Sequence, residues 1–194
     1  MGRPNQSEQR REELIPTIAA TFAELGYRRT TTAALAERCG VQETILYRLW
    51  PDKRRMFTAA IVWVADHSKE IWARELGRRS SAKTTAEAVL DYEADHLGEF
   101  GLYRIIFAGL SETDDADIKK ALRAAYRSFH AFVLERVTEH RRSRGIRGMP
   151  AAELAAWALL GLGTAANVGR ELDLMPTKER ADLMRSIGAQ LLGQ

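Results

Sequence analysis

The sequence lacks several features that specialised proteins need. Its 194 residues include one cysteine, Cys39, which rules out an intramolecular disulfide framework and suits a reducing compartment. Only five prolines occur and β-branched runs are few, which favours helices over sheet. The longest uncharged stretch, residues 154–169, is shorter than the ~20 residues of a membrane span and contains glycines. The opening MGRPNQSEQRRE holds no apolar signal segment, so we expect an all-α cytoplasmic protein without a membrane partner.

Motifs for catalysis are also absent. There is no glycine-rich phosphate loop or nucleophile elbow, and Cys39 has no neighbouring metal ligands. Glu93 and His96 match the Glu-x-x-His pattern of helical di-iron sites, but such sites need a second copy, and none exists. The other histidines, His67, His130 and His140, are scattered over different predicted helices. We predict that the protein is not an enzyme and needs no metal or cofactor.

Positive charge is concentrated at the start of the chain. Residues 1–55 carry ten Lys and Arg against seven Asp and Glu, which accounts for the whole net charge of +3. A basic segment could neutralise nucleic-acid phosphates, although an excess this small also fits an ordinary solvated surface.

The stretch Gln42–Lys53, QETILYRLWPDK, is the most informative. Before it lie a short helical segment with Thr31 as its N-cap and the tight-turn pair Gly40-Val41. Gln42 can cap a second short helix, which Pro51 ends near Trp50. Two short helices joined at a steep angle, the second with a free outer face, predict a helix-turn-helix that reads the DNA major groove.

Apolar periodicity predicts the other helices. Arg3, Arg10 and Arg11 form a mobile basic lead-in, and a first helix follows that ends at Gly26, with Pro16 marking a kink or a late start. Asp52 caps a long helix from Lys53 to about Leu76. Later helices are predicted at about 86–100, 102–110, 151–172 and 178–192. Between the second and third of these, the acidic turn 111–115 leads into a long helix, whose buried stripe continues to Val137 and whose basic tail ends at the breakers Gly145 and Gly148. About nine helices are expected in total.

Residues Leu14–Phe57 resemble the N-terminal domain of the TetR family of transcriptional regulators. The matching positions, about a quarter of the chain, are Phe22-x-x-x-Gly26-Tyr27, Thr30-Thr31-Thr32, Leu35-Ala36, Gly40-Val41, Leu46-Tyr47, Trp50 and Lys53. Thr44 and Ile45 depart from the usual residues at the start of the recognition helix, which bears on the operator sequence rather than on the fold. The resemblance implies DNA binding by residues 8–66, through Thr31, Thr32, Gln42, Glu43, Thr44, Ile45, Tyr47, Arg48 and Lys53.

Individual members of this set allow other interpretations. The resemblance places Tyr47 and Lys53 at DNA phosphates, but Lys53 could be an ordinary surface lysine. Arg48 could contact guanine or phosphate, or form a salt bridge. Ile45 could pack on a thymine methyl group or belong to the core.

For residues 67–194 the resemblance implies a helical ligand-binding and dimerisation domain. Its two last helices would form a four-helix bundle with those of a second subunit, helped by Ala155, Ala158, Gly161 and Gly163, although packing within one subunit is the alternative. The expected lining of a partly apolar effector pocket is Tyr92, His96, Tyr103, Phe107, Tyr126, Phe129, His130 and Trp157.

Together these features predict a nucleoid-associated homodimer that binds a palindromic double-stranded DNA operator and is released by a small-molecule effector. Repression is the expected outcome, and activation stays open. The alternative is a helical small-molecule or lipid-binding protein without specific DNA binding, which would not need the basic N-terminal motif.

Overall fold

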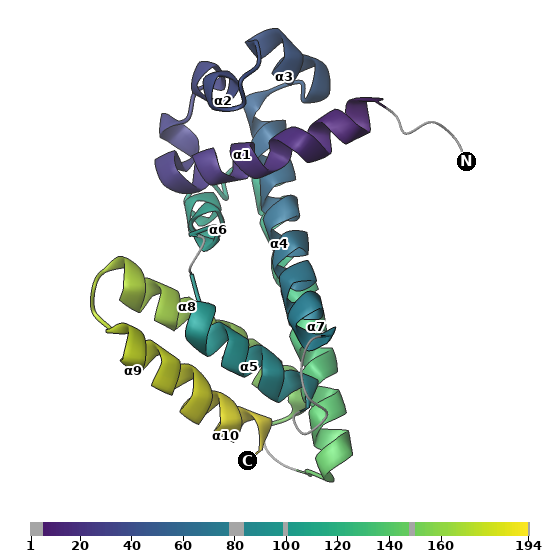
Figure 1. Cartoon of the computed structure of the whole chain (residues 1–194), viewed down its shortest axis with the longest axis vertical. Helices are drawn as coiled ribbons and strands as arrows, with labels where there is room; N and C mark the ends of the chain where they lie inside the picture. Colours follow the sequence, from purple (N-terminus) through teal and green to yellow (C-terminus); the bar gives the residue numbers. More distant parts are fainter. Residues whose placement is uncertain (1–5, 78–83, 99–100, 148–149, 194) are drawn as a thin grey trace. The chain divides into compact units, whose positions relative to one another are not determined.

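The structure, a computed structural model, describes residues 6–77, 84–98, 101–147 and 150–193. All regular elements in these ranges are helical (Figure 1). They are α1 (Gln6–Arg29), α2 (Thr32–Arg38), α3 (Glu43–Leu49), α4 (Lys53–Gly77), α5 (Thr85–His96), α6 (Tyr103–Leu110), α7 (Ala116–Arg144), α8 (Ala152–Glu171) and α9 (Thr177–Asp182), the last continuing through a π-helical stretch η1 (Leu183–Ile187) into α10 (Gly188–Leu192). With α9, η1 and α10 counted as one continuous helix, the described residues form nine helices, which confirms the all-α prediction.

Packing divides the chain into two compact units. The first draws on Met1–Asp66 and Phe100–Tyr126, and the second on His67–Glu99 and Arg127–Gln194, so that α4 and α7 contribute to both. The first unit therefore contains α6 and the start of α7 as well as the predicted helix-turn-helix. The functional boundary at residues 66 and 67 stays a prediction.

The core of the first unit is formed by the apolar faces of its helices. Ile18, Phe22, Leu35, Leu46 and Phe57 are fully buried, and the rings of Phe22 and Phe57 meet edge to face at 4.9 Å between centroids. Removing one such buried ring costs about 3–5 kcal/mol in typical proteins. These contacts hold α1, α2, α3 and the start of α4 together as one unit (Figure 1).

The start of the chain differs from the prediction in two respects. α1 begins at Gln6, so Pro16 marks no late start, and the residue with non-helical backbone angles inside α1 is Gly26, at φ 76° and ψ 166°. The positive φ is accessible to glycine without strain, which explains why the bend falls there. Arg10 and Arg11 are part of α1 rather than a mobile lead-in, and Arg3 lies outside the described residues.

In the second unit, α5 packs against α9 and η1, and α8 packs against η1 and α10 (Figure 1). Residue 188 has to be small because its backbone packs closely against α5: a Cβ atom there would lie 2.9 Å from a methyl group of Leu90. Thr84 caps α5 in a reciprocal capping box with Glu87. One predicted end was wrong: α5 stops at His96, and Phe100, its predicted end, lies outside the described residues. α7 runs to Arg144 and is followed by Gly145 at φ 66°, which confirms Gly145 as the predicted breaker.

Across the described ranges, no helix combines the length and apolar character needed to cross a membrane.

Candidate DNA-binding site

The turn between α2 and α3 is built from local hydrogen bonds. Thr31 Oγ1 accepts the backbone N–H of Ala34 at 3.1 Å, which confirms Thr31 as the N-cap of α2. Gly40 takes a positive φ of 64°, and the next amide, that of Val41, donates to the Ala36 carbonyl at 3.0 Å. Together with the bond from the Gly40 amide to the Glu37 carbonyl, also 3.0 Å, this forms a Schellman motif that ends α2 and redirects the chain into α3 within a few residues.

The two faces of α3 have different chemistry. Leu46 and Leu49 are buried, and Trp50 is buried just after the helix ends. The exposed residues are Gln42, Glu43, Thr44, Tyr47 and Arg48, which are five of the nine predicted DNA contacts. Gln42 occupies the N-cap position, but its side chain makes no capping hydrogen bond, contrary to the prediction. Without that bond, the side-chain amide of Gln42 is available for hydrogen bonds to DNA at the N-terminal end of α3.

Arg48 and Ile45 each allow two interpretations from the sequence, and the structure bears on both. Arg48 forms no hydrogen bond or ion pair with any residue in the described ranges, so the structure gives no support to the salt-bridge alternative. Ile45 is half-buried. Part of its side chain packs on the domain and part faces outward, so it is neither a full core residue nor a freely exposed one.

Tyr47 links α3 to the start of α2. Its ring is 48% exposed, and its hydroxyl donates to Thr32 Oγ1 at 3.1 Å. Thr31 and Thr32 therefore lie on the same side of the domain as the exposed face of α3. A phenol and two threonine hydroxyls on one surface are suitable phosphate donors.

Lys53 occupies the first position of α4 and is partly buried. Its ammonium donates to the carbonyls of Tyr27 and Thr30, each at 3.0 Å, and lies 4.5 Å from the centroid of the Tyr27 ring. These bonds connect α4 to the segment just before α2. An ammonium carries three N–H donors, so one remains for a phosphate group.

The end of α3 is supported by Arg11, a residue that the sequence did not mark as functional. Arg11 donates through Nε and Nη2 to the Leu49 carbonyl, at 3.0 and 2.7 Å. The acceptor belongs to the last residue of α3, where unpaired carbonyls and the negative end of the helix dipole favour a cation. The two partners are 38 residues apart in sequence, and no local pattern signals the contact.

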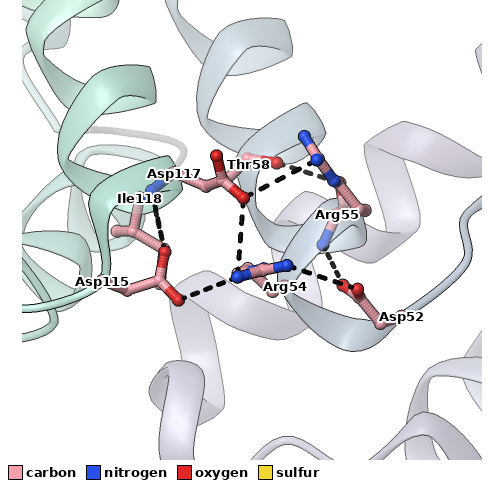
Figure 2. Close-up of polar contacts among 7 residues, drawn as sticks. All are labelled: Asp52, Arg54, Arg55, Thr58, Asp115, Asp117 and Ile118. Atoms are coloured by element: carbon pink, nitrogen blue, oxygen red, sulfur yellow. Dashed lines mark hydrogen bonds and ion pairs between the residues drawn. The ribbon is translucent and has the colours of Figure 1, made fainter.

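An ion cluster joins the first turns of α4 and α7 within the first unit (Figure 2). Asp52 Oδ1 accepts the backbone N–H of Arg55 at 2.7 Å, which confirms it as the cap of α4. Arg54 lies 3.5 Å from carboxylate oxygens of both Asp115 and Asp117. Asp115 also accepts the backbone N–H groups of Asp117 and Ile118, at 2.9 and 3.1 Å.

The charge state of Asp115 follows from these contacts. The backbone N–H of Ile118 is the largest cause that holds the Asp115 pKa below its ordinary range, and the charge of Arg54 adds to it. The sequence showed an acidic turn at residues 111–115, but not that it faces the start of α4. Glu112 from the same turn pairs with Arg28, at 2.8 Å.

The eight predicted pocket residues are divided between the two units. Tyr103, Phe107 and Tyr126 belong to the first unit and the other five to the second. The contacts are pairwise: Tyr92 stacks on His96 at 4.3 Å, Tyr103 meets Phe107 at 5.6 Å, and His130 stacks on Trp157 at 4.3 Å. Phe129 packs instead against Trp72, at 5.8 Å.

Glu93 has an environment that its sequence pattern did not reveal. Its carboxylate accepts the indole N–H of Trp72 at 2.5 Å, while His96 directs Nδ1 to the Tyr92 carbonyl. Burial is the largest influence on Glu93 and raises its pKa. Among the described residues there is no cluster of three or more His, Cys, Asp or Glu side chains suited to a metal ion.

The geometry of the first unit defines a helix-turn-helix DNA-binding domain. The inner faces of α2 and α3 are buried in the core of the unit, and the outer face of α3 is exposed. Residues 14–60 match the family model described as "Bacterial regulatory proteins, tetR family". Residues 14–60 are therefore a DNA-binding domain of the TetR type.

Comparisons with other proteins agree with this assignment. The chain is 44% identical over 61 residues to a protein named nucleoid occlusion factor SlmA from Idiomarina loihiensis, covering 31% of each chain. The chain thus spans about a third of the length of this curated relative. A TetR-family transcriptional regulator from Cytophaga hutchinsonii has the same fold, with a TM-score of 0.80 at 17% identity, covering 98% of this chain and 96% of that one. The regulator FadR from Bacillus subtilis, solved with stearoyl-CoA, has a TM-score of 0.73 at 14% identity, covering 94% and 97%.

Proposed function

We propose that the protein is a ligand-responsive transcriptional repressor that binds a palindromic DNA operator as a homodimer. The observation that carries the proposal is the outer face of α3, where polar side chains are exposed above a buried apolar face. In this proposal residues 8–66 bind DNA and residues 67–194 bind the effector and the second subunit.

The nine predicted contacts fall into two kinds: those that position the domain on the DNA backbone and those that recognise bases. Thr31, Thr32, Tyr47 and the third N–H of Lys53 would donate to phosphates, which set the register of the domain on the duplex. Gln42, Glu43, Thr44 and Arg48 would reach base edges from the start and outer face of α3. Of these, Arg48 is the strongest candidate for a guanine, because its guanidinium is exposed and unpaired among the described residues.

Ile45 is proposed to contact a thymine methyl group in each half-site. Truncation to alanine should relax the preference at one base position and cost about 1–3 kcal/mol in binding. Its half-buried position means that some stability is lost too, less than the about 2–5 kcal/mol of a fully buried isoleucine. Binding of wild-type protein to operators with uracil in place of thymine isolates the methyl contact. Indifference to the missing methyl groups would refute it.

The homodimer is proposed from one face of α8. Large apolar side chains stay exposed on α8 and at its C-cap, at helical spacing: Leu154, Trp157, Val168 and the C-cap Leu172, at 58%, 45%, 40% and 63%. Ala158 and Gly161 are also exposed on α8, but Ala155 is fully buried within its own subunit, so it does not belong to this face as predicted. Light scattering should give twice the 21.8 kDa of one chain, and a mass of one chain at micromolar concentration would refute the dimer.

The effector response is proposed as a shift of α4 that changes the separation of the two recognition helices. Half-sites lie about one helical turn apart, ~34 Å, or a multiple of it, so a small shift loses register with the DNA. A solved regulator of the same fold contains stearoyl-CoA, which supports an effector with apolar character for this chain. Within the second unit, Tyr92, His96 and His130 are the proposed lining.

Selection of bound DNA from a random pool tests the proposal. The expected result is a palindromic motif, bound with a dissociation constant that rises steeply with salt. Arg48→Ala should abolish selection of the motif, whereas Arg142→Ala, on an exposed site of α7, should leave it unchanged. If no sequence is enriched and the protein still binds apolar small molecules, the chain is a helical carrier.

A further inference from the structure

The second unit contains a cleft of about 300 Å³ that the DNA-binding proposal does not use. It lies between the end of α5, the last turns of α8 and the start of α9, and Asp95, His96, Leu97, Arg170, Thr177 and Arg180 line it. Its volume is at the lower end of the range for small-molecule sites, about 300–1,000 Å³. A ligand that fits it is therefore small.

Two arginines in this cleft have no carboxylate partner among the described residues. Arg170 donates through Nη1 to the Leu97 carbonyl at 3.0 Å. Arg180 donates through Nη1 to the Met175 carbonyl at 2.5 Å, and through Nη2 to Thr177 Oγ1 at 3.0 Å. These bonds fix both guanidinium groups without neutralising them, and each group, with five N–H donors, keeps several in reserve.

The other charges near the cleft do not cancel this positive charge. Asp95 lines the cleft, but Arg185 forms an ion pair with it and also lies 3.7 Å from Asp91. The C-terminal end of α8 near Arg170 contributes about −0.5 charge, which is less than the two guanidinium charges. His96, stacked on Tyr92, directs Nδ1 to the Tyr92 carbonyl and so leaves Nε2 available.

We propose that this cleft binds a small oxyanion, a carboxylate or phosphate group, between the guanidinium groups of Arg170 and Arg180. Charge-assisted hydrogen bonds from a planar guanidinium match the geometry of either oxyanion. Because Leu97 and Thr177 follow α5 and open α9, the bound anion would fix the end of one helix against the start of another. The proposal does not depend on DNA binding, and its test contains no DNA.

Calorimetric titration of the full chain tests it with two probes, inorganic phosphate and acetate, at an ionic strength held constant with sodium chloride. Saturable binding of phosphate alone assigns the site to a phosphate-bearing ligand, and saturable binding of acetate assigns it to a carboxylate. Absence of saturation with both probes overturns the proposal.

Variants locate the binding. Arg180→Gln should weaken binding by about tenfold or more, the worth of one charge-assisted contact. Arg142→Gln, which removes the same charge from an exposed site on α7, should bind like wild type. Equal weakening in both variants would show a general effect of charge and overturn the site.

A second pair of variants covers the case in which Arg180→Gln fails to fold. Thr177→Tyr places a large ring in the cleft and should abolish binding, whereas Lys178→Tyr, at the exposed neighbouring position, should not. A Thr177→Tyr protein that binds the probe as wild type does would also overturn the proposal.

Discussion

Replacing Lys53 by methionine separates two roles that the structure assigns to one side chain. The resemblance to TetR-family proteins places Lys53 at a DNA phosphate, while the structure shows its ammonium bonded to the carbonyls of Tyr27 and Thr30. Methionine keeps most of the aliphatic stem and removes the donors. Both carbonyls then lose a charged partner, and Thr30 is fully buried.

The expected loss of stability follows from these contacts. A hydrogen bond to a charged group contributes about 1.5–3 kcal/mol, and an exposed cation–π contact about 0.5–1 kcal/mol. Because Lys53 is only partly buried and the contacts share one ammonium, we expect a total of about 2–4 kcal/mol. For a chain of this size that lowers the melting temperature by about 5–15 °C.

The phosphate role has a different signature. Loss of one phosphate contact per subunit reduces the slope of log affinity against log salt by about two per dimer. The matched control is Lys119→Met, at an exposed position of α7, which should change neither the melt nor the slope. A Lys53→Met protein that melts with wild type would refute the structural role, and an unchanged slope would refute the phosphate contact.

Three further predictions concern contacts that hold the site. Arg11→Met should lower the free energy of unfolding by about 1–3 kcal/mol in chemical denaturation, because Leu49 loses both its donors; a wild-type midpoint would contradict this. Because the Asp115 pKa is lowered, its contribution is complete above its ordinary pKa of 3.8 and disappears as the pH falls through the folded value. Asp115→Asn should therefore melt below wild type at neutral pH and close to it near pH 2, where an undiminished gap would argue against the ion cluster. Burial raises the pKa of Glu93 above its ordinary value of 4.5. The stability of the wild-type protein therefore falls as the pH rises from 4.5 through the pKa of Glu93 in the folded state. Glu93→Gln, which still accepts from Trp72, should melt above wild type at pH 7, and a lower melting temperature would show that the ionised carboxylate stabilises the fold.

The helix-turn-helix was predictable because its signals are local. Thr31 caps α2, Gly40 takes the positive φ of the turn, and Pro51 follows the end of α3. Each acts within four residues of its own position. The apolar spacing of α3 also separates buried from exposed residues, so the outer face could be named from sequence alone.

The supporting contacts could not be predicted, because their partners are distant in sequence. Lys53 reaches carbonyls 26 and 23 residues away, and Arg11 reaches one 38 residues away. Periodicity describes which face of a helix is apolar but not which backbone atom a long polar side chain meets. The pocket stays a prediction for a related reason: aromatic spacing marks burial, and its residues are divided between the unit that contains α6 and the unit that contains α5 and α8.

The π-helical stretch η1 illustrates the same limit. A single helix was expected from 178 to 192, and the chain does run continuously, but with a wider turn at Leu183–Ile187. No residue in LMRSI forbids an α-helix. Gly188 directly follows the wider turn and packs against Leu90 of α5, a tertiary contact that helical periodicity does not encode.

The arginine pairings in the first unit change what its charge can do. Arg28, Arg54 and Arg55 lie against Glu112, Asp115 and Asp117, and Arg38 pairs with Glu24. Each pair reduces the positive potential that a distant DNA duplex would experience. Electrostatic steering, which accelerates association when like charges accumulate on one surface, is therefore weak here. If the protein binds DNA as proposed, a matched site is then distinguished from other sequences by slower dissociation of the protein rather than by faster association.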